Sequence, residues 1–164
     1  FRARHLPLDA LWLDIQHMDG FRTFTWDPAG FPDPAALAAR LAADDLHLVT
    51  IADPGIKVDA GYAVYETMIA GDHALRRADG TLYTGTAWPG ESAWPDVSDS
   101  GAREWWAGWA GTLADVGVSG IWLDVNEPTT FPEGGGGTTI DDDVPCAGDG
   151  VATTMAETDE FGKS

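Results

Sequence analysis

Three short apolar segments of strand length constrain the fold of this chain more than any other feature of the sequence. They span residues 9–15, 46–52 and 118–125. Each is rich in β-branched or aromatic residues and is apolar at alternating positions on both sides. This pattern is typical of parallel strands that are buried on both faces. The sequence therefore predicts an α/β fold built around a parallel sheet.

Helical patterns lie between these segments. The first follows Asp33 and Pro34, which suit the N-cap and the first helical position. The second is expected to be capped by Ser98 or Ser100 and to end at Gly117. The resulting order is strand, helix, strand, long loop, helix, strand. It predicts two successive βαβ units with right-handed crossovers.

An aspartate stands at or just after the end of each predicted strand. These residues are Asp14, Asp53 and Asp124. Because the carboxyl ends of parallel strands meet at one edge, we expect the three carboxylates on one rim. The long connection 53–97 leaves from the same edge, and a loop of that length is usually functional. Aromatic residues stand nearby, namely Trp12, Trp88, Trp122 and Phe131.

Carboxylates and aromatic rings on one rim fit two kinds of site. A sugar site needs acids that hold hydroxyls or act at the anomeric carbon, and flat apolar surfaces for the ring. A metal site needs clustered oxygen or nitrogen ligands. Trp105, Trp106 and Trp109, within the second predicted helix, are expected to pack against other elements instead.

The segment 120–128 is the sharpest motif. It places Asp124 and Glu127 three residues apart, and Pro128 disfavours a helical conformation at Glu127. A strand running into a turn is therefore expected. Acidic groups placed this close together repel one another. A turn that contains them is therefore more consistent with a functional site than with a purely structural role.

Composition excludes several classes of partner. The 164 residues carry a net charge of −18, which disfavours nucleic acid and anionic membrane surfaces as partners. No run of apolar residues is long enough to span a membrane. A single cysteine, Cys146, excludes an internal disulfide scaffold and a multi-cysteine zinc site.

The two ends of the chain differ from its body. The chain starts at Phe1 without a signal-peptide pattern, so a cytoplasmic location is favoured and the native N-terminus is expected to be absent. Residues 133–164 are rich in glycine and aspartate. We expect a division into a catalytic part, 1–132, and a loop and tail, 133–164, that buries too little apolar surface to order itself.

Several motifs in unbroken order resemble glycoside hydrolase family 31, the α-glucosidase and α-xylosidase family. The segment Trp122-Leu123-Asp124-Val125-Asn126-Glu127-Pro128 resembles the family's nucleophile segment. Further similar segments are Leu13-Asp14-Ile15-Gln16-His17-Met18-Asp19-Gly20, Asp53-Pro54-Gly55-Ile56-Lys57-Val58-Asp59 and Trp88-Pro89-Gly90. The resemblance covers residues 2 to 132.

The resemblance implies a partial (β/α)8 TIM barrel. This chain would supply about strands two to four with their helices, and a long loop after the third strand. The implied activity is hydrolysis of O-glycosidic bonds by a retaining, α-glucosidase-type enzyme. Its substrate would be an α-linked gluco-oligosaccharide or another α-glycoside. No cofactor or metal is implied, and the rest of the parent barrel is the expected protein partner.

Site residues follow from the resemblance position by position. Asp124 takes the nucleophile position, and Glu127 the position of an acid that supports the nucleophile's surroundings. Asp14 takes the position that binds hydroxyls of the sugar in subsite −1. The remaining positions are implied to line the substrate site: Ile51, Trp88 and Trp122 around subsite −1, Phe131 near the leaving group, and Asp53 in a supporting role.

The sequence departs from the family pattern in places, and two rival functions remain open. Val125 replaces the usual methionine after the nucleophile, and the family's acid/base aspartate belongs to a later strand beyond this chain. One rival is a carbohydrate-binding remnant of the barrel without turnover. The other is a metal-dependent hydrolase with Asp14, Asp53 and Asp124 as ligands.

Overall fold

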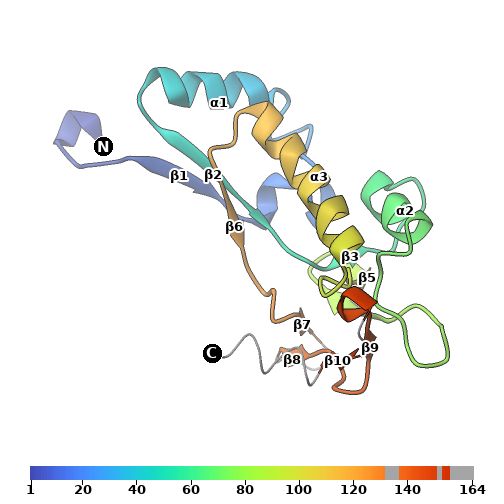
Figure 1. The fold of residues 1–164 in the computed structure, drawn as a ribbon. Coiled ribbons are helices and arrows are strands. Elements are labelled where there is room, and N and C mark those ends of the chain that lie inside the picture. Colours follow the sequence, from blue (N-terminus) through green and yellow to red (C-terminus); the bar gives the residue numbers. More distant parts are fainter. Residues whose placement is uncertain (132–136, 151–152, 156–164) are drawn as a thin grey trace.

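A computed structural model describes residues 1–131, 137–150 and 153–155 (Figure 1). The helices are α1 (Pro34–Ala43), α2 (Ala63–Ala70) and α3 (Ser100–Val116). The strands of the main sheet are β1 (Ala10–Leu13), β2 (His47–Ala52) and β6 (Gly120–Leu123). The shorter strands are β3 (Ile56–Lys57), β4 (Thr84–Ala87), β5 (Gly90–Ala93), β7 (Thr129–Thr130), β8 (Thr138–Thr139), β9 (Pro145–Cys146) and β10 (Thr153–Thr154).

The main sheet is parallel, as the sequence predicts. Its strand order is β1-β2-β6, so β2 lies between two edge strands. Leu13 pairs with Thr50 on β2, and Ala52 pairs with Leu123 on β6. Two βαβ units joined by α1 and α3 produce this order, and both helices lie on the same side of the sheet (Figure 1).

The two long helices have well-defined ends. Asp33 accepts a hydrogen bond from the backbone N–H of Ala36 and caps α1, as predicted. The cap of α3 is Asp99, which accepts from Ala102, so the prediction of Ser98 or Ser100 is wrong by one residue. An aspartate carboxylate offers a charged acceptor at the positive end of the helix, which favours it over a hydroxyl there.

The α3 tryptophans pack against other elements, as expected. The ring of Trp106 lies 4.9 Å from that of Phe24, measured between centroids. The indole N–H groups of Trp105 and Trp109 both donate to the hydroxyl of Thr67 on α2. These contacts fix α2 against α3.

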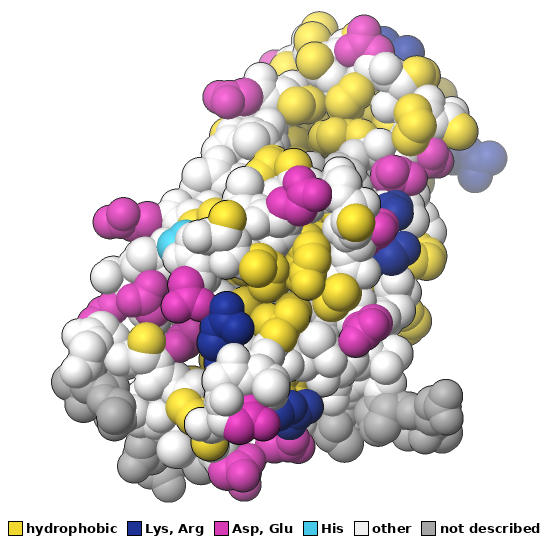
Figure 2. Space-filling view, turned by 90° about the vertical axis from the view of Figure 1, so that its right-hand side faces the viewer, with side chains coloured by type: hydrophobic (Ala, Val, Ile, Leu, Met, Phe, Trp, Pro, Cys, Tyr) yellow, Lys and Arg dark blue, Asp and Glu magenta, His cyan; other side chains and the backbone are white. Residues whose placement is uncertain are grey.

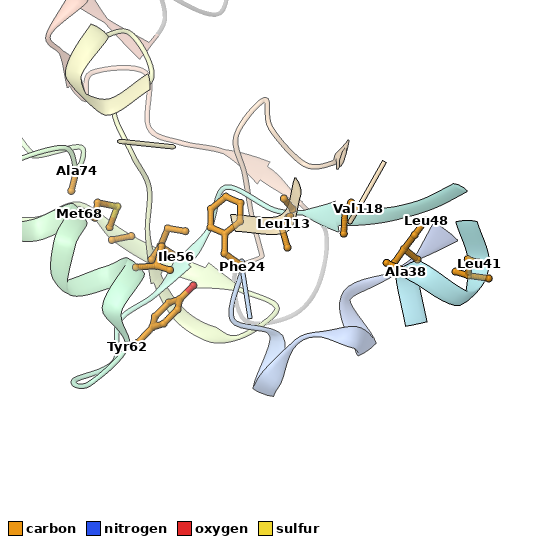
Figure 3. Packing of buried hydrophobic residues seen from close by; sticks show 13 residues of the cluster. Phe24, Ala38, Leu41, Leu48, Ile56, Tyr62, Met68, Ala74, Leu113 and Val118 are labelled. Carbon is orange, nitrogen blue, oxygen red and sulfur yellow. The ribbon is translucent and has the colours of Figure 1, made fainter. Parts of the chain in front are cut away.

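One apolar cluster joins the sheet to the helices. Figure 3 shows it running from Leu41 of α1 and Leu48 of β2 past Leu113 of α3 to Ile56 of β3 and Met68 of α2. Leucine and methionine side chains fill the space between helix and sheet and remove apolar area from water. The core therefore lies on the helix side of the main sheet.

The opposite side of the sheet is more open. Trp12, which pairs in register with Val49 on that side, is 61% exposed. On the helix side, Leu123 of the edge strand β6, which pairs with Ala52, is also exposed, at 54%. The prediction that the strands are buried on both faces is therefore wrong for these positions, because Trp12 and Leu123 belong to the two edge strands.

The long connection after β2 folds into a small unit of its own. It contains α2 and an antiparallel sheet of order β3-β5-β4, neither of which the sequence patterns indicated. A second cluster forms here around Leu75, Tyr83 and Trp94. This unit lies beyond the carboxyl end of β2, next to the predicted rim (Figure 1).

Part of the C-terminal stretch packs against this unit. Ile140, Val144 and Cys146 are buried in the same cluster as Trp94. The expectation that residues 133–164 bury too little to become ordered is therefore wrong for the described part of that stretch. These apolar side chains stand among glycines and aspartates, and the residues they pack against lie about 50 residues earlier. Local composition therefore does not reveal that they are buried. The predicted boundary at 132/133 lies outside the described residues and stays a prediction.

The surface is strongly acidic. Figure 2 shows Asp and Glu side chains scattered over one face, with few basic side chains among them. This distribution agrees with the net charge of −18. Of the helices described, none has the length and apolar character needed to cross a membrane.

A pair of glycine substitutions tests the junction of α3 with β6. Gly117 ends α3 at φ 103°, and a Cβ there would stand 3.0 Å from the Cβ of Ala38. Gly117→Ala should therefore destabilise the protein by about 1 kcal/mol or more. Gly108, inside α3, has open space for a Cβ, so Gly108→Ala should stabilise by about 0.5–1 kcal/mol. Thermal midpoints of the protein measure both effects, and a Gly117→Ala midpoint at or above that of the wild type would contradict the left-handed conformation of Gly117.

Candidate active site

The strand register brings the three predicted carboxylates to one edge of the main sheet. Because Ala52 pairs with Leu123, the next residues, Asp53 and Asp124, stand level at the ends of β2 and β6. Asp14 follows Leu13, the last residue of β1. Alternation along the strands places all three side chains on the side opposite α1 and α3.

Asp14 forms the edge nearest β1. One of its carboxylate oxygens accepts a hydrogen bond of 2.7 Å from the N–H of Ile15 and caps the short 3-10 helix Ile15–His17. The residue is exposed, so its carboxylate stays accessible. The backbone carbonyl of Asp14 lies 2.8 Å from Nδ1 of His17. The strand end and the helix cap together fix the position of this acid.

His17 has a structural role in this loop. It is buried and packs edge-on against the ring of Trp26, at 4.9 Å between centroids. Burial lowers the pKa of His17, and the nearby Asp14 only partly opposes this effect. The imidazole is therefore neutral at neutral pH and supports the loop that follows Asp14.

Asp53 is the buried member of the group, with 8% of its surface exposed. Burial raises its pKa to about 7, and the charges of Asp124 and Asp14 contribute in the same direction. Its Oδ1 is enclosed and has no hydrogen-bond partner among the described residues. Thr23 donates its hydroxyl to the backbone carbonyl of Asp53 at 2.8 Å.

Asp124 leads from β6 into a tight turn. Its side chain is half-buried, whereas Glu127 is exposed. Val125 between them adopts φ 51°, a left-handed conformation that is strained for a β-branched residue. The turn is closed by a hydrogen bond from the N–H of Thr129 to the carbonyl of Val125, and the Thr129 hydroxyl donates to Glu127 Oε2 at 3.1 Å.

Aromatic and aliphatic side chains flank the carboxylates in two groups. Trp122 packs with the cluster of Ile51, Ile15 and Met18, and its ring meets that of Trp12 edge-on at 6.0 Å. Trp12 and Trp122 present the apolar surface beside Asp14, and the buried Ile15, Met18 and Ile51 lie beneath them. Trp12, Ile51 and Trp122 come from neighbouring strands, so the sheet fixes their positions.

The second group comes from the added antiparallel unit. The rings of Trp88 and Phe131 lie 5.1 Å apart, and Trp88 is 54% exposed. Phe131 is held by a hydrogen bond from its N–H to the carbonyl of Thr86 on β4. The structure thus places Phe131 beside the hairpin that carries Trp88, and links the segment after β6 to the long connection after β2.

The described residues contain no group of three His, Cys, Asp or Glu side chains placed to hold a metal ion. The metal-dependent alternative therefore finds no ligand set in this part of the chain. A cavity of about 410 Å³ is lined in part by Arg22, Phe24, Asp59 and Trp109. None of the predicted site residues lines it.

The sequence did not indicate three residues that hold the site in place, namely Thr23, Tyr62 and Thr86. The hydroxyl of Tyr62 donates to the Thr23 carbonyl, and the Thr23 hydroxyl donates to the backbone carbonyl of Asp53. Thr86 supports Phe131 in a similar way. These partners are separated by 30 residues or more, so no local pattern could have indicated them.

Comparison with known proteins identifies the family of this chain. Residues 1–155 match the family described as "Glycosyl hydrolases family 31 TIM-barrel domain". Alpha-glucosidase 2 of Bacillus thermoamyloliquefaciens is 40% identical over 133 residues, which are 81% of this chain and 17% of that protein. Neutral alpha-glucosidase AB of Homo sapiens is 42% identical over 137 residues, which are 80% of this chain and 14% of that protein. The chain thus spans less than a fifth of the length of these two relatives.

Solved structures agree with the sequence matches. The crystal structure of an ER glucosidase II complex of catalytic subunit and regulatory-subunit binding domain has a TM-score of 0.81 at 36% identity. It is matched over 90% of this chain and 16% of that chain. The crystal structure of a family 31 alpha-glucosidase from Bacteroides thetaiotaomicron has a TM-score of 0.75 at 36% identity, over 87% of this chain and 24% of that chain. The parallel sheet with its carboxylate rim is therefore one part of a TIM barrel, and the chain belongs to glycosyl hydrolase family 31.

Proposed function

We propose that this chain forms part of the active site of a longer retaining α-glucosidase. The observation that carries the proposal is the shared edge at which Asp14, Asp53 and Asp124 end parallel strands. Family membership and the names of the relatives, which are alpha-glucosidases, support it. The substrate class that fits is a neutral α-linked gluco-oligosaccharide or a similar α-glycoside.

Asp124 acts as the nucleophile in this proposal. Its carboxylate attacks the anomeric carbon, a carbon–oxygen bond forms to Asp124, and the glycosidic bond breaks. The departing oxygen takes its proton from an acid/base residue outside this chain, with the two carboxyl groups about 5–5.5 Å apart in a retaining enzyme. Water then releases the sugar from Asp124. The rigid end of β6 aims the carboxylate at one carbon.

The other site residues bind or support. Asp14 accepts hydrogen bonds from sugar hydroxyls, which its exposed carboxylate allows. Trp122, packed on the buried Ile51, forms the apolar side of subsite −1, and Trp88 with Phe131 forms a second aromatic surface toward the leaving group. Glu127, linked to Thr129, supports the turn that follows the nucleophile.

Anomeric preference of the complete enzyme tests the proposed function. Aryl α-glucoside, aryl α-xyloside and aryl β-glucoside are compared by kcat/KM. We expect the α-glucoside or α-xyloside to be preferred, and phosphorylated sugars to be poor substrates because the acidic surface repels anions. Preference for the β-anomer would overturn the proposal. Binding of α-glucosides without any turnover would instead support the carbohydrate-binding alternative.

Asp14→Asn separates the binding acid from the nucleophile. Asparagine keeps the shape and loses the charge, so hydroxyl hydrogen bonds weaken and KM should rise about 10-fold, with a fall in kcat as well. Added azide should not restore turnover, since no space is vacated beside the anomeric carbon. Steady-state kinetics with and without azide measure this, and azide rescue of Asp14→Asn would contradict the assigned roles.

A further inference from the structure

The three carboxylates of the rim have unequal surroundings. Asp14 is exposed and accepts a backbone hydrogen bond, and Asp124 is half-buried at the start of a turn. Asp53 is buried, and its Oδ1 has no partner among the described residues. A buried ionised carboxylate without a donor is costly, whereas a protonated one is not. The geometry therefore selects Asp53 as the acid that carries a proton.

The charges around Asp53 act in the same direction. The charged groups that act on it are Asp124 at the end of β6 and Asp14 at the end of β1, and both disfavour its ionisation. The Thr23 hydroxyl donates to the backbone carbonyl of Asp53, and the Tyr62 hydroxyl donates to the carbonyl of Thr23. Burial raises the pKa of Tyr62, so this hydroxyl stays neutral. Among the residues that the structure describes, no cation contributes to the shift in the pKa of Asp53.

We propose that Asp53 is a positioning residue that holds a proton in the resting enzyme and thereby leaves Asp124 as an ionised carboxylate beside it. This inference rests on the proposed function, because it assumes that Asp124 is the nucleophile. Like charges on neighbouring strand ends raise the cost of ionising both, so a proton on Asp53 removes that cost for Asp124. Asp53 acts through Asp124 and need not touch the sugar.

Asp53→Asn in the complete enzyme tests the proposal through a pH profile. Asparagine reproduces the shape of the protonated acid and cannot ionise. With α-glucosyl fluoride, whose fluoride leaves without needing a proton, kcat/KM reports attack by the nucleophile. The wild type gains a second charge beside Asp124 as pH rises from about 6 to about 8, whereas the variant does not. The ratio of the two kcat/KM values should therefore change several-fold across this window, with a midpoint near the pKa of Asp53, about 7.

A second measurement does not depend on activity. Because the pKa of Asp53 is about 7 in the folded protein and its usual value is 3.8, the folded state binds the extra proton between these values. Wild-type stability is therefore lost as pH rises through this window. The thermal midpoint of Asp53→Asn minus that of the wild type should rise from about pH 4 to about pH 7 and then level off.

Each outcome decides the proposal. A kcat/KM ratio that changes near pH 7 supports it, together with a midpoint difference that rises over the same range. A constant ratio, a constant midpoint difference, or an Asp53→Asn variant that does not fold would overturn it, since the variant copies the proposed state. If the enzyme hydrolyses no α-glucoside, the proposed function fails, but the midpoint difference still reports on the proton of Asp53.

Discussion

Asp124→Ala in the complete enzyme should reduce turnover of α-glucosides by about 10⁴-fold or more, the order seen when a covalent nucleophile is removed. Alanine leaves a space at the end of β6 where the carboxylate stood. Azide should fill that space and attack the anomeric carbon of an activated aryl α-glucoside from the same side. The expected product is the β-glucosyl azide, which chromatography and NMR identify.

Asp115→Ala is the matched control for this substitution. Asp115 is an exposed aspartate near the end of α3, away from the carboxyl ends of the strands. Its removal should leave kcat/KM within about twofold of the wild type, as expected for a surface change. Residual activity of Asp124→Ala above one per cent, or azide products with the α configuration, would contradict the role of Asp124.

The isolated 164-residue chain should show no glycosidase turnover and should self-associate. Both outer strands of the main sheet, β1 and β6, are edges with unpaired backbone groups. Trp12 and Leu123 on these strands expose large apolar surfaces. Light scattering coupled to size exclusion should find oligomers at micromolar concentration. A monomer with a sharp thermal transition, or clear turnover, would contradict this expectation.

Charge at the edge should reduce this association. Leu123→Lys places a cation on the exposed edge strand β6 and should raise the monomer fraction. Val97→Lys is the matched control, because Val97 is similarly exposed but lies outside the strands of the main sheet. Equal effects of the two substitutions would show that general charge, and not the sheet edge, controls the association.

The main sheet and its two long helices could be predicted because their signals are local. Strand-length apolar runs, the cap Asp33 and the terminal Gly117 each depend on a few neighbouring residues. The strand ends then placed Asp14, Asp53 and Asp124 on one edge by topology alone. The shared edge of these three aspartates depends on the order of strands and helices. It does not depend on any single long-range contact.

The added unit and the buried tail could not be predicted in the same way. The helix α2 is eight residues long, and its N-cap, Tyr62, makes no side-chain capping hydrogen bond, so the usual start signal is missing. Ile140 and Val144 are isolated among polar residues and are buried only because Trp94 lies opposite them. Such elements depend on tertiary contacts, which outweigh local propensity.

The sequence also did not indicate that the three carboxylates differ in burial. Asp14, Asp53 and Asp124 stand in similar local contexts at strand ends. Asp53 alone is buried, and its backbone carbonyl accepts a hydrogen bond from Thr23, which lies 30 residues earlier. Its raised pKa is a consequence of this long-range packing and of the neighbouring charges.

Labelling of the nucleophile tests the central claim most directly. A fluorinated α-glucosyl compound that forms a slowly hydrolysed glycosyl-enzyme is incubated with the complete enzyme, and the labelled peptide is sequenced by mass spectrometry. We expect a covalent sugar on Asp124, in the peptide that contains Trp122 and Glu127. A label on Asp14, Asp53 or Glu127 would contradict it.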